Sequence, residues 1–207
     1  MSSWVSQNSV FLSLPEQELL ALLAYGEAAS DGVEGMMAVL NTVRNRATQP
    51  SAYADSSIPA DVYVQVALKQ KQYSSFNLND SVRATLLKFA GNWDAYYASN
   101  PTLQSAYDLA GMLLNGTLAD NTGGATHFFA PAGVSQTPSW AASMDYIGQI
   151  GTQLFYSVLP AWQRVQSDIA GVSASVSEEL GIDTTTTYII AGIIGIAAIM
   201  LIGRKRG

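Results

Sequence analysis

The chain of 207 residues contains no cysteine and a single histidine, His127. The absence of cysteine excludes disulfides and thiolate-bound zinc or iron–sulfur clusters. A single histidine also excludes a metal site built from several imidazoles. We therefore expect neither a metal site nor a cofactor.

Charge is also scarce. Charged residues make up 13% of the chain, and ten Lys and Arg stand against sixteen Asp and Glu, for a net charge of −6. Proteins that bind nucleic acid present a basic surface to the phosphate backbone, so this balance predicts no nucleic-acid partner. Residues 1–9 contain no basic residue and no long apolar run follows them, which predicts that no secretory signal peptide is present.

The longest apolar run lies at the C-terminus. Residues 184–203 contain no charged side chain, and Arg204, Lys205 and Arg206 follow directly. About 20 mainly apolar residues with a positive flank are typical of a membrane-spanning helix. We expect an N-terminal segment at 1–12, a catalytic domain at 13–165, a Ser/Thr-rich linker at 166–187, a transmembrane helix at 188–203 and a basic tail at 204–207.

Apolar spacing predicts a mainly helical α+β domain. The sequence Ser13-Leu14-Pro15-Glu16 has the pattern of a capping box, which predicts a helix start, and the apolar residues that follow carry this helix to about Ala29. A second helix, capped by Asp31 and Glu34, is expected to reach Arg46. Further helices are predicted at 61–70, 81–97 and 103–115, and a short strand at 125–130.

Glu27 lies at the end of the first long helix, directly after an apolar run. Loss of hydration and the negative end of the helix dipole both favour the neutral carboxyl and raise its pKa. A raised pKa suits a general acid for glycosidic bond cleavage. From these residues alone, a glutamate on a solvated helix face is the alternative interpretation.

Three blocks of sequence resemble the SleB-type cell-wall hydrolase family, which includes spore-cortex lytic enzymes and phage peptidoglycan hydrolases. The blocks are Glu27-Ala28 with Asp31, Gly35, Ala38-Val39 and Asn45-Arg46, then Gln72-Tyr73-Ser74, then residues 123–131; Trp140, Ile147-Gly148 and Phe155-Tyr156 continue the pattern. The resemblance implies a lysozyme-like fold and cleavage of the MurNAc-β-1,4-GlcNAc bond, with Glu27 as the catalytic residue.

The later motifs supply the expected substrate-binding residues. Some of these residues have structural alternatives: the aromatic rings either stack on sugars or belong to the core, Ser74 either contacts substrate or the acid or caps a loop, and His127 either binds sugar or peptide or is structural. Asn45 and Arg46 are expected to end the second helix and to form structural hydrogen bonds. The predicted binding set is Gln72, Tyr73, Ser74, His127, Phe129 and Trp140.

The predicted reaction depends on the number of catalytic carboxylates, and the sequence motifs single out only one. Glycosidases that retain or invert configuration use two carboxylates, yet none of the nearby acids Asp31, Glu34 and Asp120 is marked as the second one. A lytic transglycosylase needs only one, and we predict this reaction. The alternatives are a muramidase and a non-catalytic peptidoglycan-binding or structural membrane protein. An amidase is disfavoured because zinc ligands are lacking.

The two ends of the chain give conflicting predictions of where the protein is located. The basic tail predicts a cytoplasmic C-terminus and a catalytic domain across the membrane, but no signal peptide provides for its export. A membrane-containing phage avoids this conflict because the particle delivers the protein from outside. We predict a virion-associated enzyme for phage entry, with glycan strands, lipid and virion proteins as partners. Lysis from within and a host envelope role are the alternatives.

Overall fold

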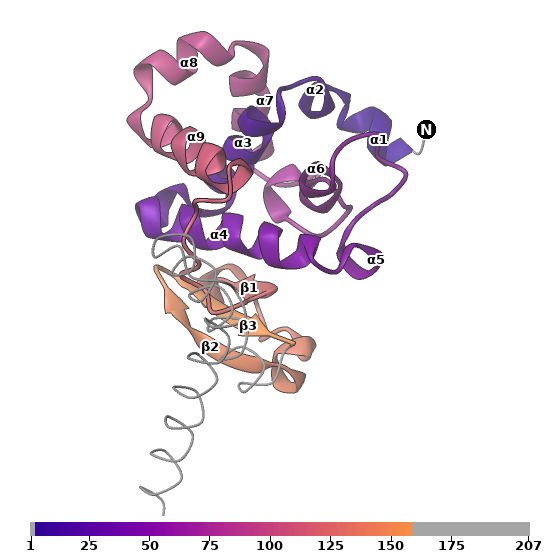
Figure 1. Cartoon of the computed structure of the whole chain (residues 1–207), viewed down its shortest axis with the longest axis vertical. Coiled ribbons are helices and arrows are strands. Elements are labelled where there is room, and N and C mark those ends of the chain that lie inside the picture. The colour runs from indigo at the N-terminus through magenta and orange to yellow at the C-terminus, as the bar shows by residue number, and fades with distance from the viewer. Residues whose placement is uncertain (1–2, 159–207) are drawn as a thin grey trace, which may run out of the picture. The chain divides into compact units, whose positions relative to one another are not determined.

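The computed structural model describes residues 3–158 of the chain (Figure 1). The predicted linker 166–187, transmembrane helix 188–203 and basic tail 204–207 lie outside these residues, as does the end of the predicted catalytic domain. None of the helices within residues 3–158 has the length and apolar character needed to cross a membrane.

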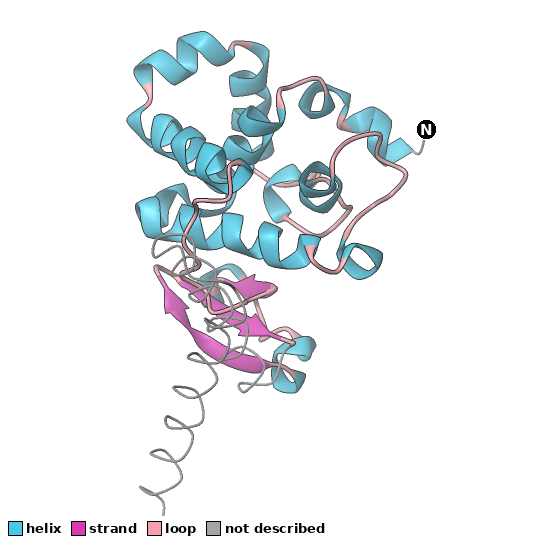
Figure 2. Cartoon of the chain, viewed as in Figure 1, coloured by secondary structure: helices cyan, strands magenta, loops and turns pink. Residues whose placement is uncertain are grey.

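Helices dominate the first two thirds of the described chain, and the strands follow them (Figure 2). The predicted mainly helical α+β class is confirmed. The helices are α1 (Ser3–Gln7), α2 (Ser9–Leu12), α3 (Glu16–Ala28), α4 (Gly32–Ala47), α5 (Pro50–Tyr53), α6 (Val62–Ala67), α7 (Arg83–Gly91), α8 (Trp93–Ser99) and α9 (Pro101–Leu114). Short 3₁₀ helices are η1 (Ala29–Asp31), η2 (Ser74–Phe76), η3 (Pro131–Gly133) and η4 (Ser139–Ser143).

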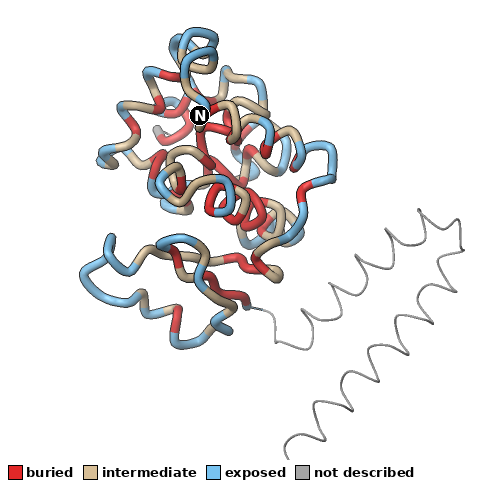
Figure 3. The backbone as a smooth tube through the Cα atoms, turned by 90° about the vertical axis from the view of Figure 1, so that its left-hand side faces the viewer, coloured by how far each residue is buried: buried red, intermediate tan, exposed pale blue. Residues whose placement is uncertain are grey.

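Helix α3 forms the centre of the helical part and is enclosed by α4, α6 and α9. Every residue from Leu19 to Ala24 is buried, so apolar side chains surround the helix over nearly two turns. A helix that is apolar all round must be covered on all sides. The tube in Figure 3 shows this buried centre, which agrees with the mostly buried helix expected from the sequence.

The start of α3 differs from the prediction. No capping box forms, because the Ser13 hydroxyl donates to the Val10 carbonyl oxygen at 2.7 Å and Pro15 stands at the N-cap. Ser13 therefore terminates α2 rather than starting α3. The segment 1–12, which we expected to be separate from the catalytic domain, contributes the buried side chains of Val5 and Phe11 to the same core as α3.

The predicted helix at 81–97 is two helices. The chain breaks at Asn92, where φ is −152° and ψ is 57°, so α8 leaves in a new direction (Figure 1). These dihedrals lie outside the α region, and an asparagine side chain competes for backbone hydrogen bonds. The spacing of apolar residues alone does not predict such a local break in a helix.

The sheet contains β1 (His127–Phe129), β2 (Asp145–Ile150) and β3 (Gln153–Ser157). Its order is β1-β3-β2, with both pairs antiparallel. The predicted strand at 125–130 contains β1, whereas the β2–β3 hairpin was not predicted. Gly151 stands in the tight turn of this hairpin with φ of 58°, a conformation that favours glycine.

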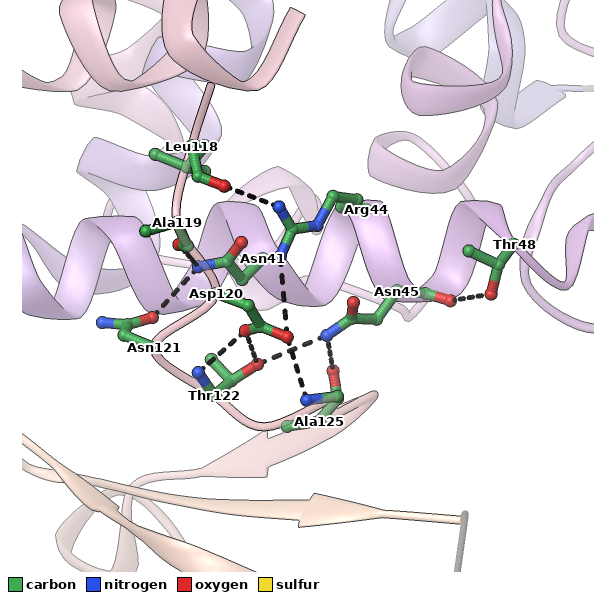
Figure 4. A network of polar contacts seen from close by, with 11 residues as sticks. Asn41, Arg44, Asn45, Thr48, Leu118, Ala119, Asp120, Asn121, Thr122 and Ala125 are labelled. Atoms are coloured by element: carbon green, nitrogen blue, oxygen red, sulfur yellow. Dashed lines mark hydrogen bonds and ion pairs between the residues drawn. The ribbon is translucent and has the colours of Figure 1, made fainter. Parts of the chain in front are cut away.

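Polar side chains on one face of α4 bind the backbone that leads into the sheet (Figure 4). The Asn41 amide donates to Ala119 O at 2.8 Å, Arg44 to Leu118 O at 2.6 Å and Asn45 to Ala125 O at 2.9 Å. The Arg46 Nε group donates to Thr126 O at 2.6 Å. The structural hydrogen bonds expected of Asn45 and Arg46 are confirmed, and they fix the position of β1.

Candidate active site

The carboxylate of Glu27 lies in the last turn of α3, as the sequence predicted. The Ser75 backbone N–H donates to Oε1 at 2.7 Å, and the Ser74 hydroxyl lies 3.3 Å from both carboxylate oxygens. From the sheet, the Gln153 amide donates to the backbone carbonyl oxygen of Glu27 at 2.8 Å. The acid is thus held by α3, η2 and β3 together.

Gly26 allows η2 to approach so closely. A Cβ atom at this position would lie 2.7 Å from Ser75 Cβ and 2.9 Å from Leu86 Cδ1. Any larger residue would push the 3₁₀ turn away from α3 and remove the Ser75 N–H from the carboxylate. Gly26 therefore keeps the Ser75 N–H within hydrogen-bond distance of the Glu27 carboxylate.

Burial raises the pKa of Glu27, and the charge of Asp80 acts in the same direction. Hydrogen bonds from Ser75 and Ser74 stabilise the carboxylate and oppose this rise without cancelling it. The direction agrees with the expectation from the sequence. A carboxyl that holds its proton more tightly than usual suits proton donation near neutral pH.

A pocket of about 340 Å³ opens beside Glu27. The helical part contributes one wall, and β1, β3 and the segment after β1 contribute the other. The lining residues are Glu27, Arg46, Lys71, Gln72, Ser74, Asn77, Phe128, Phe129, Ala130, Gly133, Val134 and Gln153. Glu27 is thus the only acid among the described residues that line it.

Four of the predicted site residues, Glu27, Gln72, Ser74 and Phe129, line this pocket. Gln72 also has a structural role, because its amide donates to Tyr53 O at 2.9 Å and to Val66 O at 2.7 Å. These bonds fix the loop before η2. Ser74 contacts the acid directly, which was one of the two roles considered for it.

Tyr73 lies in the core. Its side chain is 2% exposed, its hydroxyl lies 3.2 Å from Thr42 Oγ1, and the Arg46 guanidinium lies 4.7 Å from the ring centroid. A ring enclosed in this way has no free face for a sugar, which argues against the stacking role suggested by the sequence.

His127 and Trp140 are not among the lining residues of this pocket. Their ring centroids are 5.0 Å apart, and Trp140 contacts Phe129 edge to face at 5.8 Å. His127 Nδ1 lies 2.9 Å from Thr126 Oγ1. Burial lowers the pKa of His127 to about 4, so the ring is neutral at neutral pH, and it contacts Phe129 through Trp140.

The other acids near the motifs hold structure together. Asp31 accepts from the Thr152 N–H at 2.9 Å and the Thr152 hydroxyl at 3.0 Å; it makes no side-chain cap on α4, contrary to expectation. Asp120 lies 3.5 Å from Arg44, and Glu34 lies 3.4 Å from the Asn121 amide. None of these three acids lines the pocket.

Sequence reasoning assigned no substrate role to several pocket residues, namely Arg46, Lys71, Asn77 and Gln153. Arg46 belonged to a recognised motif but was interpreted as structural. Gln153 reaches Glu27 only through a hairpin that had not been predicted. Across residues 3–158, no group of three or more metal-ligating side chains occurs, and the residues of this pocket suit acid–base chemistry.

Comparison with known proteins assigns the family. The model of the cell wall hydrolase family matches residues 30–156, and this chain belongs to that family. The matched range begins just after Glu27 and ends in β3. No curated protein matches the chain.

Two solved structures are similar to the chain. One is the catalytic domain of the germination-specific lytic transglycosylase SleB from Bacillus anthracis, with 21% identity over 69% of this chain and 93% of that chain, at a TM-score of 0.46. The other is the catalytic domain of the Bacillus cereus SleB protein, with 22% identity over 69% of this chain and 89% of that chain, also at 0.46.

Proposed function

We propose that this protein degrades peptidoglycan by cleaving the MurNAc-β-1,4-GlcNAc bond, with Glu27 as acid and base. The observation that carries the proposal is a raised-pKa carboxyl at the pocket of a cell wall hydrolase domain. General acid–base groups must lie within reach of the substrate and hold a proton near the working pH. Glu27 lines the pocket, and its pKa is raised in the direction that the second condition requires.

The reaction we propose is that of a lytic transglycosylase. Glu27 donates its proton to the glycosidic oxygen as the C1–O bond breaks. The resulting carboxylate then accepts the proton of the C6 hydroxyl of the same sugar, whose oxygen attacks C1 and closes a 1,6-anhydro ring. Glu27 thus regains the proton that it donated, and no water is consumed. The Ser75 N–H and the Ser74 hydroxyl stabilise the carboxylate between the two steps.

A muramidase is the second candidate, and Asp80 is the residue that favours it. After burial, its negative charge makes a smaller contribution in the same direction to the raised pKa of Glu27, as a second catalytic carboxylate would. However, Asp80 is absent from the pocket lining, and its Oδ1 accepts from the Val82 N–H at 2.8 Å. This arrangement is that of a turn cap, which supports the transglycosylase.

The test uses the purified full chain on bacterial sacculi, with products identified by mass spectrometry. We expect 1,6-anhydro ends from the parent, and Glu27→Gln should lose at least about 100-fold in rate while remaining folded. Glu34→Gln is the matched control outside the pocket and should retain activity. Asp80→Asn should retain it too.

Each other outcome has a definite meaning. Loss of activity in Asp80→Asn together with reducing MurNAc ends would assign a muramidase. Released peptides would indicate an amidase. A folded Glu27→Gln protein with full activity would contradict the role of Glu27, and a parent that binds sacculi without cutting them would indicate a non-catalytic protein.

We also propose that the apolar run 188–203 anchors this enzyme in the membrane of a phage particle, for wall opening during genome entry. Support comes from the uncharged run and its basic flank in the sequence. Purified particles should contain the protein, produce a lytic zone on a peptidoglycan gel and release it on delipidation. Its absence from particles and its presence in cell envelopes would favour lysis from within or a host envelope role.

A further inference from the structure

The charge of the pocket is opposite to that of the protein. The chain has sixteen Asp and Glu against ten Lys and Arg, yet its described pocket lining has two cations, Arg46 and Lys71, and the single acid Glu27. Such a local excess of positive charge in an acidic protein favours an anionic group on the substrate.

Lys71 is held in an unusual conformation at this pocket. Its φ of 65° is the only positive value among the described residues other than glycine. The side chain is exposed, and the neighbouring Gln72 pins the loop through its bonds to Tyr53 O and Val66 O. Left-handed backbone is uncommon and unfavourable for a residue with a long side chain, and such residues cluster at functional sites. The pinned loop thus holds the exposed Lys71 at the lining of the pocket.

Arg46 provides a second, fixed positive charge. Its side chain is 5% exposed, and its Nε donates to Thr126 O at 2.6 Å. Its buried Nη1 has no hydrogen-bond partner within the described part of the chain. No carboxylate among residues 3–158 forms an ion pair with Arg46 or Lys71. The two cations of the pocket lining are therefore not paired with the single acid Glu27 or with any other carboxylate among residues 3–158.

We propose that Lys71 binds a carboxylate of the lactyl–peptide substituent carried by MurNAc, within the positive potential of Arg46. This proposal rests on the proposed function and narrows its substrate to glycans that bear carboxylates. The MurNAc substituent presents such a group either on its peptide or, where the peptide is missing, on the lactyl group itself. A polymer of GlcNAc alone offers none. Lys71 is a substrate-binding residue in this proposal and takes no part in the proton transfers.

The experiment compares native sacculi with sacculi whose carboxyl groups have been amidated with a neutral amine. For the parent full chain, kcat/KM should fall about fivefold on the amidated substrate, the size expected of one partly exposed ion pair. Lys71→Gly should lose about fivefold on native sacculi and show no further loss on amidated ones. Lys71→Arg keeps the positive charge and should restore the sensitivity to amidation that Lys71→Gly lacks. The control Lys88→Ala, which removes an exposed lysine outside the pocket, should behave as the parent.

Two readouts separate this proposal from its alternatives. Glycine relieves the left-handed backbone, so Lys71→Gly should have a Tm at least equal to that of the parent, and its loss of activity cannot reflect unfolding. Equal sensitivity of parent and Lys71→Gly to amidation would overturn the proposal. If the parent proves inactive, binding of Glu27→Gln to native and amidated sacculi still tests carboxylate binding, independently of catalysis.

Glycan stripped of peptides by an amidase identifies the carboxylate. In whole sacculi the lactyl carbonyl is amide-linked to the peptide, so a higher activity of the parent than of Lys71→Gly that is lost on stripped glycan assigns the carboxylate to the peptide. A difference that persists on stripped glycan shows that Lys71 also accepts the lactyl carboxylate, which stripping exposes. Either result supports the proposal, whereas parity of the two proteins on both substrates contradicts it.

Discussion

The helical part and the sheet of this protein are stabilised by different forces. The helices share one large apolar cluster, which includes the enclosed face of α3. The sheet packs against α4 through a small cluster of three buried residues, Ala38, Ala125 and Phe155. It depends on polar bonds from α4 as well. Because the pocket takes Glu27 from the first part and Phe129 and Gln153 from the second, its geometry depends on those polar bonds.

The largest effect should follow from damage to the helical core. Leu22 is fully buried, so Leu22→Ala should lower the free energy of unfolding by about 2–5 kcal/mol through lost burial and a cavity. Urea denaturation measures this loss. Met112→Ala, at a 38% exposed position on α9, is the control and should change stability by at most about 0.5 kcal/mol. Equal losses would contradict the role of apolar burial in stabilising the helical part.

Removal of a hydrogen bond to the sheet should reduce stability less, and activity more, than a substitution in the helical core. Asn45→Ala leaves the Ala125 carbonyl oxygen without its donor, which should lower the free energy of unfolding by about 1–3 kcal/mol. Since this bond positions β1, activity below the melting transition should fall further than in a core variant of equal stability. Asn79→Ala, at an exposed loop position, should match the parent in both measurements.

The turn of the hairpin offers a smaller test of the same idea. Thr152→Val removes the hydroxyl donor to Asp31 and keeps the backbone bond, so the loss should be about 1 kcal/mol. Hydrogen exchange should locate this change in β2 and β3, with the amides of α3 unaffected. Uniform loss of protection in both parts would show that the hairpin and the helical core unfold together.

The smallest effect concerns the pH dependence of stability. The pKa of Glu27 is raised in the folded protein above its ordinary value of 4.5. Its contribution to stability is therefore complete below pH 4.5 and is lost as the pH rises through the folded-state pKa. Glu27→Gln has no proton to lose, so its stability relative to the parent should increase across that range. Urea unfolding at several pH values measures the difference, and a constant difference would exclude the shift.

Much of the helical part could be predicted because helix patterns are local. The run from Leu19 to Ala24 is apolar at every position, which indicates burial whatever covers it. The position of Glu27 behind this run indicated loss of hydration and a raised pKa. Asn45 and Arg46 could be recognised as structural because they end a helix with polar groups that must find partners.

The sequence by itself determined the helical core, the acid at the end of α3 and the family blocks around it. Only the tertiary structure decided which side chains meet that acid. Tyr73 and Phe129 are both aromatic, yet one is enclosed beside Thr42 and the other lines the pocket. Gln153 and Lys71 reach the site through a hairpin turn and a pinned loop. These placements depend on contacts between distant segments, and a local pattern of residues carries no information about which segments will pack together.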